Sequence, residues 1–217
     1  METVYAGNIK NKFFEYEPVN SPVKAQYKQE MGSSALLEMC KAFSRVTLGK
    51  VFIFIADCDE PKIVKEMGGG NKKYKDWGNN VYSFVLPVPP YRNATPEICI
   101  EHYYSDEEIK TLYVCADGKK RRLFLGKDFD KYGRDVIDGL MCIKRNLCGP
   151  ESIKVIDGFS DTRVISMNEE NDINYALSKQ DFVTFSTIKK DSQTYNAFRE
   201  IFMIIQSIIK DYQRRYS

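Results

Sequence analysis

A six-residue apolar run, Val51 to Ala56, leads directly into the acidic segment Asp57-Cys58-Asp59-Glu60. Such an unbroken run is typical of a strand covered on both faces, as in a parallel or mixed sheet. Ligands in open α/β sheets bind at the carboxyl ends of the strands, where these acids would lie. Two carboxylates one residue apart can bind Mg²⁺ directly and through its waters. The run therefore predicts a buried strand ending in a metal site that handles phosphates, although Asp pairs also begin ordinary turns.

Strand-like and helix-like segments alternate through the first half of the chain. Apolar runs predict further strands over 81–86 and 98–100, and helical spacing predicts helices from Ser34 to Gly49 and over 61–67. The strand at 98–100 leads into Glu101. This alternation predicts an α/β fold with a mostly parallel central sheet flanked by helices.

The second half of the chain gives weaker patterns. Possible capping residues at Ser105 and Ser178 predict two helix starts, and 123–125 and 136–143 favour a strand and a helical turn. Apolar residues from Tyr195 to Tyr212 recur at helical spacing and predict a long amphipathic C-terminal helix. We expect one domain over 1–217, with an elaborated C-terminal half from about residue 115.

Composition excludes several classes of protein. With 43% hydrophobic and 13% aromatic residues, the chain can build a core, which excludes a disordered protein. A single histidine excludes a His-rich zinc site, and six cysteines without a CxxC pair indicate reduced thiols and a cytoplasmic location. No leader-like segment or membrane-spanning apolar run is present in the sequence. The net charge of +2 says little about partners.

Four residues are candidates for catalysis. Asp57 and Asp59 are the expected metal ligands, and Glu101 would complete a three-carboxylate cluster at the same sheet edge, unless it is an ordinary surface acid. Such a cluster would bind Mg²⁺ and position a water and a phosphate. Lys179 lies at a predicted helix start, where the helix dipole disfavours a cation, so it could instead neutralise a phosphoryl transition state or be an exposed turn residue. His102, as a lone histidine, favours a structural role.

A lysine-rich segment follows the glycines at 68–70. Lys72, Lys73 and Lys75 could track a nucleic-acid backbone, and Trp77 could stack a base. Basic segments of this kind are otherwise solvated turns.

Five short motifs, at 52–59, 79–84, 87–90, 98–101 and 176–182, form a set. Together they resemble the Toprim-like nuclease domain of the OLD-family (overcoming lysogenization defect) ATP-dependent endonucleases and related phage-defence proteins, over about residues 30 to 190. The resemblance implies that Asp57 and Asp59 are metal ligands, Glu101 the later acid and Lys179 the active-site lysine. It also implies that Mg²⁺ or Mn²⁺ supports cleavage of DNA, in preference to RNA.

The chain departs from that family in two respects. The family has an earlier glutamate followed by glycine, whereas Glu2, Glu15, Glu17 and Glu30 are followed by other residues. No GxxxxGK[ST] motif is present, so an ATPase would belong to a partner or to an upstream domain. Either the chain is part of a longer polypeptide, or it is a degenerate protein that binds without cutting.

Three functions follow from these residues. The first is a metal-dependent nuclease that cleaves DNA phosphodiesters in anti-phage defence or DNA processing. The second is a catalytically degenerate interaction module that retains the acids. The third is a small phosphatase with Asp57 as the nucleophile, but that class requires Thr or Val where this chain has Pro61, and a downstream Asp-Asp pair that the sequence lacks.

Overall fold

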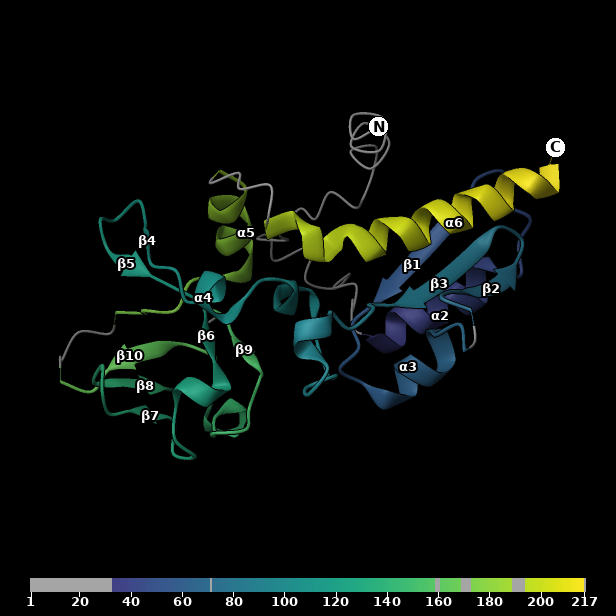
Figure 1. Ribbon diagram of the computed structural model, residues 1–217. Helices are drawn as coiled ribbons and strands as arrows, with labels where there is room; N and C mark the ends of the chain where they lie inside the picture. Colours follow the sequence, from purple (N-terminus) through teal and green to yellow (C-terminus); the bar gives the residue numbers. More distant parts are fainter. Residues whose placement is uncertain (1–32, 71, 159–160, 169–172, 189–193, 217) are drawn as a thin grey trace, which may run out of the picture.

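The computed structural model describes residues 33–70, 72–158, 161–168, 173–188 and 194–216 (Figure 1). The helices are α2 (Ser33–Phe43), α3 (Pro61–Met67), α4 (Asp106–Ile109), α5 (Lys179–Ile188) and α6 (Arg199–Tyr216), and the 3-10 turns are η2 (Pro90–Arg92), η3 (Ile100–Tyr103), η4 (Gly126–Asp128), η5 (Arg145–Leu147) and η6 (Thr194–Phe198). The strands are β1 (Phe52–Ala56), β2 (Lys75–Gly78), β3 (Val81–Val85), β4 (Tyr113–Val114), β5 (Lys120–Arg121), β6 (Phe124–Leu125), β7 (Arg134–Asp135), β8 (Leu140–Cys142), β9 (Val155–Ile156) and β10 (Val164–Ser166).

The first region, which we call the sandwich region, consists of α2, α3, β1 to β3 and α6. Its sheet has the order β1-β3-β2, with β1 parallel and β2 antiparallel to β3. Helices α2 and α3 cover one face of the sheet and α6 covers the other (Figure 1). Alternate residues of β3 enter the two layers: Val81 packs with α2 and α3, while Tyr82 and Phe84 pack with α6.

The second region, which we call the β-rich region, spans β4 to β10 and α5. Its strands are two or three residues long and pair antiparallel, in the sheet β10-β8-β7 and in the pairs β4-β5 and β6-β9. Phe124 and Leu125 of β6 are both buried but belong to separate apolar clusters. Successive strand residues point to opposite faces, so this short strand joins both clusters of the region.

A connecting segment, residues 86–112, joins the two regions and is held by a buried arginine. The guanidinium group of Arg92 donates from Nε to the carbonyl of His102 at 3.2 Å and from Nη2 to that of Tyr104 at 2.8 Å. Its Nη1 pairs with Asp106 at 2.7 Å, and Asp106 also pairs with Lys127 near β6. Arg92 therefore fixes η3 between the two regions.

The predicted mostly parallel central sheet is wrong. In the part of the chain that the structure describes, only β1 and β3 form a parallel strand pair, and no sheet has more than three strands. Part of the lysine-rich segment forms strand β2, which is linked to β3 through Asn79 and Asn80, both with positive φ. Such a two-residue link favours a hairpin, so β3 acquires an antiparallel neighbour instead of a crossover helix and another parallel strand.

Among the individual predicted elements, some are confirmed and others are wrong. The predicted helix over 61–67 is confirmed as α3, the caps at Ser105 and Ser178 precede α4 and α5, and the C-terminal helix is α6. The predicted strand over 98–100 is wrong, because η3 begins there, and the predicted helical turn over 136–143 is the β7-β8 turn and β8. None of the described helices is long and apolar enough to cross a membrane.

Candidate functional site

The end of β1 is anchored to the segment that carries Glu101. Asp57 directly follows β1, and its Oδ1 accepts a hydrogen bond from the backbone N–H of Ile100 at 3.2 Å. The next backbone N–H, that of Cys58, donates to the carbonyl of Ile98 at 2.8 Å. These bonds bring the turn η3 to the carboxyl end of the parallel β1-β3 pair, where ligands of α/β sheets bind.

Glu101 is a buried acid with only one of its oxygens paired. Its side chain is 8% exposed, and Oε1 forms an ion pair with Nζ of Lys179 at 3.1 Å. The other oxygen, Oε2, is buried and has no hydrogen-bond partner among the described residues. A buried carboxylate oxygen without a partner is costly, so this position favours a cation or a hydrogen-bond donor.

Lys179 is the first residue of α5 and remains charged in this environment. Burial disfavours its cation, but the negative charge of Glu101, with smaller effects of Cys99 and Asp157, outweighs burial and raises the pKa of Lys179. The predicted misfit of a cation at this helix start therefore has a physical explanation, because Glu101 compensates for the unfavourable helix dipole. A protonated Lys179 can neutralise negative charge but cannot act as a general base.

The surroundings of Asp57 disfavour the ionised form of its carboxyl group. Protein around its carboxyl group, together with the charges of Glu101 and Asp59, raises the pKa of Asp57 to about 6, while Lys179 and the Ile100 N–H act in the opposite direction. All four predicted catalytic residues are therefore electrostatically coupled, although 122 positions, from 57 to 179, separate the first from the last in the chain. A cation bound beside these carboxylates would reduce the repulsion that raises the pKa of Asp57.

His102 holds η3 in place instead of serving as a base. Its Nδ1 accepts from the backbone N–H of Cys99 at 3.0 Å, and its Nε2 lies 2.7 Å from the carbonyl of Ile153. Burial lowers the pKa of His102, so the neutral ring donates from Nε2. The Cys99 thiol lies 3.1 Å from Nδ1, but burial and then Glu101 raise the pKa of this thiol. This pair is therefore a poor nucleophilic dyad.

Lys154 is a neighbour of the site that the sequence pattern missed. Its Nζ lies 3.9 Å from Oδ2 of Asp59, and both side chains are substantially exposed. Lys154 precedes β9, a two-residue strand with no readable periodicity, so no sequence signal places it beside Asp59.

The lysine-rich segment has mostly internal contacts. Lys73 pairs with Glu200 of α6 at 2.8 Å, and Lys75 donates to the carbonyl of Glu66 at 2.6 Å and lies over the Trp77 ring. Trp77 itself donates to Oγ of Ser83 at 2.8 Å. These contacts explain Trp77 as a packing residue of the sheet. Lys72 is exposed.

Comparison with protein-family models, with curated proteins and with solved structures finds no match for this chain. What the site can do is therefore inferred from its own residues.

The donor set suits a hard cation bound with few protein ligands. No group of three or more His, Cys, Asp or Glu side chains in the described residues is assembled to hold a metal ion. Mg²⁺ commonly binds through one or two carboxylates, several waters and substrate phosphates, so a closed cage is not needed. The unpartnered Glu101 Oε2 and the Asp57 carboxylate are oxygen donors of this kind.

Proposed function

We propose that this chain is a metal-dependent nuclease that cleaves DNA phosphodiesters. The observation that carries the proposal is the pairing of Glu101: one buried oxygen is neutralised by Lys179 and the other is unpartnered, beside Asp57 with its raised pKa. The setting, anti-phage defence or DNA processing, and an ATPase in a partner or upstream domain, come from the motif resemblance and stay predictions.

The proposed roles follow from the chemistry of each group. Asp57 and Glu101, with Asp59 nearby, would hold Mg²⁺ or Mn²⁺, which when bound supplies Lewis-acid activation of water and of the phosphate. Lys179, already protonated and fixed by Glu101, would offset the negative charge that grows on the phosphoryl oxygens. Lys154, whose Nζ lies 3.9 Å from Asp59 and whose side chain is exposed, would contact the substrate backbone.

The decisive experiment is nicking of supercoiled plasmid in Mn²⁺. We expect cleavage by the wild type, and at least a 100-fold slower rate for Asp57→Asn, a loss of about 2.7 kcal/mol in transition-state stabilisation. Glu107→Gln is the matched control, since Glu107 is an exposed acid of α4 outside the site. Equal cleavage by wild type and Asp57→Asn would contradict the proposed site.

A second readout needs no turnover. A cation that binds only the folded protein stabilises it by about 1.4 kcal/mol at tenfold excess over its Kd. We expect Mn²⁺ to raise the Tm of the wild type and of Glu107→Gln, but not that of Glu101→Gln. No cleavage and no shift would favour the interaction module, and phosphate release from p-nitrophenyl phosphate with a covalent Asp57 adduct would favour the phosphatase.

A further inference from the structure

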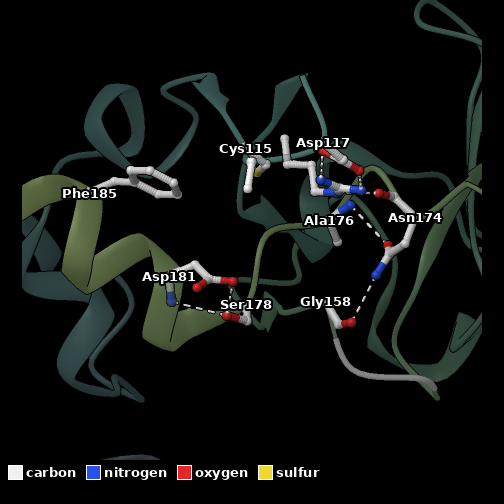
Figure 2. Close-up of a pocket in the computed structure, with 10 residues that line it drawn as sticks. Cys115, Asp117, Gly158, Asn174, Ala176, Ser178, Asp181 and Phe185 are labelled. Atoms are coloured by element: carbon white, nitrogen blue, oxygen red, sulfur yellow. Dashed lines mark hydrogen bonds and ion pairs between the residues drawn. The ribbon is translucent and has the colours of Figure 1, made fainter. Parts of the chain in front are cut away.

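A cavity of about 500 Å³ lies between the β4-β5 hairpin and the start of α5 (Figure 2). Phe185 and Asp181, both from α5, line one side, and Asp117 and Asn174 line the side across from them. Ala176 adds an apolar side chain to the lining of the cavity. The volume lies in the range typical of small-molecule sites.

The far wall of this cavity is held rigidly by its own polar contacts. Arg121 forms a two-bonded ion pair with Asp117, at 2.8 and 2.7 Å, and donates from Nε to the carbonyl of Asn174 at 2.8 Å. The Asn174 side chain donates to the carbonyl of Gly158 at 2.8 Å and accepts from the N–H of Ala176 at 3.0 Å. Because these groups are already paired, the wall is preformed.

The aromatic side of the cavity offers a stacking surface. Phe185 is half-buried, and its ring stacks on Tyr113 with centroids 5.1 Å apart and an interplanar angle of 14°. Tyr113 therefore supports one face of the Phe185 ring and holds its orientation. Asp181 accepts from the Ser178 hydroxyl at 2.7 Å, and its exposed carboxylate adds acceptor capacity at the rim.

The cavity and the candidate catalytic site share two stretches of backbone. Ser178 lines the cavity, and the next residue, Lys179, forms the ion pair with Glu101. Gly158 also lines the cavity, and the preceding residue, Asp157, acts electrostatically on Lys179. The cavity wall at Ser178 therefore continues directly, along the chain, into the lysine that pairs with Glu101.

We propose that this cavity binds one unstacked base of a single-stranded nucleic acid whose neighbouring phosphate lies at Lys179. This inference rests on the proposed nuclease function and adds the strand state of its substrate. A base combines a planar face for Phe185 with an amino group that can donate to the exposed carboxylate of Asp181. A paired base within a duplex offers no free face, so a duplex would have to open or flip a nucleotide before binding here.

The test measures base stacking without cleavage. A trideoxynucleotide with 2-aminopurine in the middle is titrated with Asp57→Asn protein in EDTA, and quenching of the 2-aminopurine fluorescence reports stacking. We expect saturable quenching, weakened about tenfold in affinity by adding Phe185→Leu, which keeps apolar bulk but removes the aromatic face. Phe202→Leu, at a half-exposed phenylalanine of α6 outside this cavity, is the matched control and should bind unchanged.

The outcomes separate this inference from the nuclease proposal. Absence of quenching, or quenching that Phe185→Leu leaves unchanged, would overturn the base site even if plasmid is nicked. Quenching that depends on Phe185 in a protein whose wild type never cleaves would keep the base site and refute the nuclease. Circular dichroism of both leucine variants checks that each is folded.

Discussion

The sandwich region and the β-rich region bury their apolar side chains in different ways. In the sandwich region, five-residue strands place side chains on two faces, and helices cover both faces. In the β-rich region, strands of two or three residues alternate with turns, and apolar residues from many short segments are gathered into two clusters. The packing of the first region therefore follows the regular spacing of apolar residues along its strands and helices. The packing of the second region depends instead on contacts between distant segments.

The candidate site lies where these two regions meet. Asp57 comes from the sandwich region, Glu101 from the connecting segment, and Lys179 and Lys154 from the β-rich region. A site assembled this way depends on both regions being folded together.

The largest effect should come from two matched core truncations, Phe84→Ala and Phe124→Ala, one in each region. Both rings are at most 1% exposed, so each change should lower the free energy of unfolding by about 3–5 kcal/mol. Because the regions share the connecting segment, we expect both variants to unfold in one transition in urea, followed by fluorescence and circular dichroism. Two separate transitions, each shifted by only one variant, would mean that the regions fold independently.

A smaller loss is expected for Arg92→Met, which removes the guanidinium group from the connecting segment. The change leaves the carbonyls of His102 and Tyr104 without these donors and breaks the pair with Asp106, so stability should fall by about 2–3 kcal/mol. Arg134→Met removes an exposed ion pair with Asp130 and should cost less than about 1 kcal/mol, measured by the same unfolding experiment. Equal losses for the two variants would contradict a special role of Arg92.

The charge coupling across the junction can be measured through Asp57. Glu101→Gln removes one of the carboxylates that raise the pKa of Asp57, so this pKa should fall from about 6 toward 3.8 in a ¹³C NMR titration. A raised carboxyl pKa means that the folded state binds the proton more tightly, so this group makes stability fall as pH rises from about 4 to 6. That fall should be smaller in Glu101→Gln.

Two outcomes bear on this interpretation. The coupling free energy between Glu101→Gln and Lys179→Met should be about 1 kcal/mol, because the lysine is 37% exposed and solvent screens the pair. An unchanged Asp57 pKa in Glu101→Gln would contradict the coupling to Glu101 and leave burial and Asp59 as the causes of the shift.

The smallest effect is expected at Ile137, in the turn that links β7 to β8, where the sequence pattern predicted a helical turn. Ile137 is 95% exposed, so Ile137→Ala should change stability by less than about 0.5 kcal/mol. Gly139 has φ +65°, and a Cβ there would lie 2.8 Å from Nδ2 of Asn168, so Gly139→Ala should cost about 1 kcal/mol or more by thermal unfolding. The reverse order of the two losses would argue for a helix at this position.

The amount of the fold that the sequence predicted differs between the two regions. The apolar strand before Asp57, the Pro61–Met67 helix and the C-terminal helix were predictable because each is set by local periodicity and end signals. The helical turn expected over 136–143 was wrong because Val136 and Ile137, apolar in sequence, are exposed in the link between β7 and β8. Apolar residues that are exposed to solvent give a misleading periodicity.

For the candidate site, the sequence by itself determined which acids and which lysine to examine, because Asp57, Asp59 and Lys179 stand at the ends or starts of recognisable elements. Only the tertiary structure decided that Glu101 is buried on η3, that it pairs with Lys179, and that Lys154 joins Asp59. It also decided that the sheet is small and mixed. The physical reason is that local patterns fix where an element begins and ends, whereas strand partners and ion pairs depend on segments far apart in the chain.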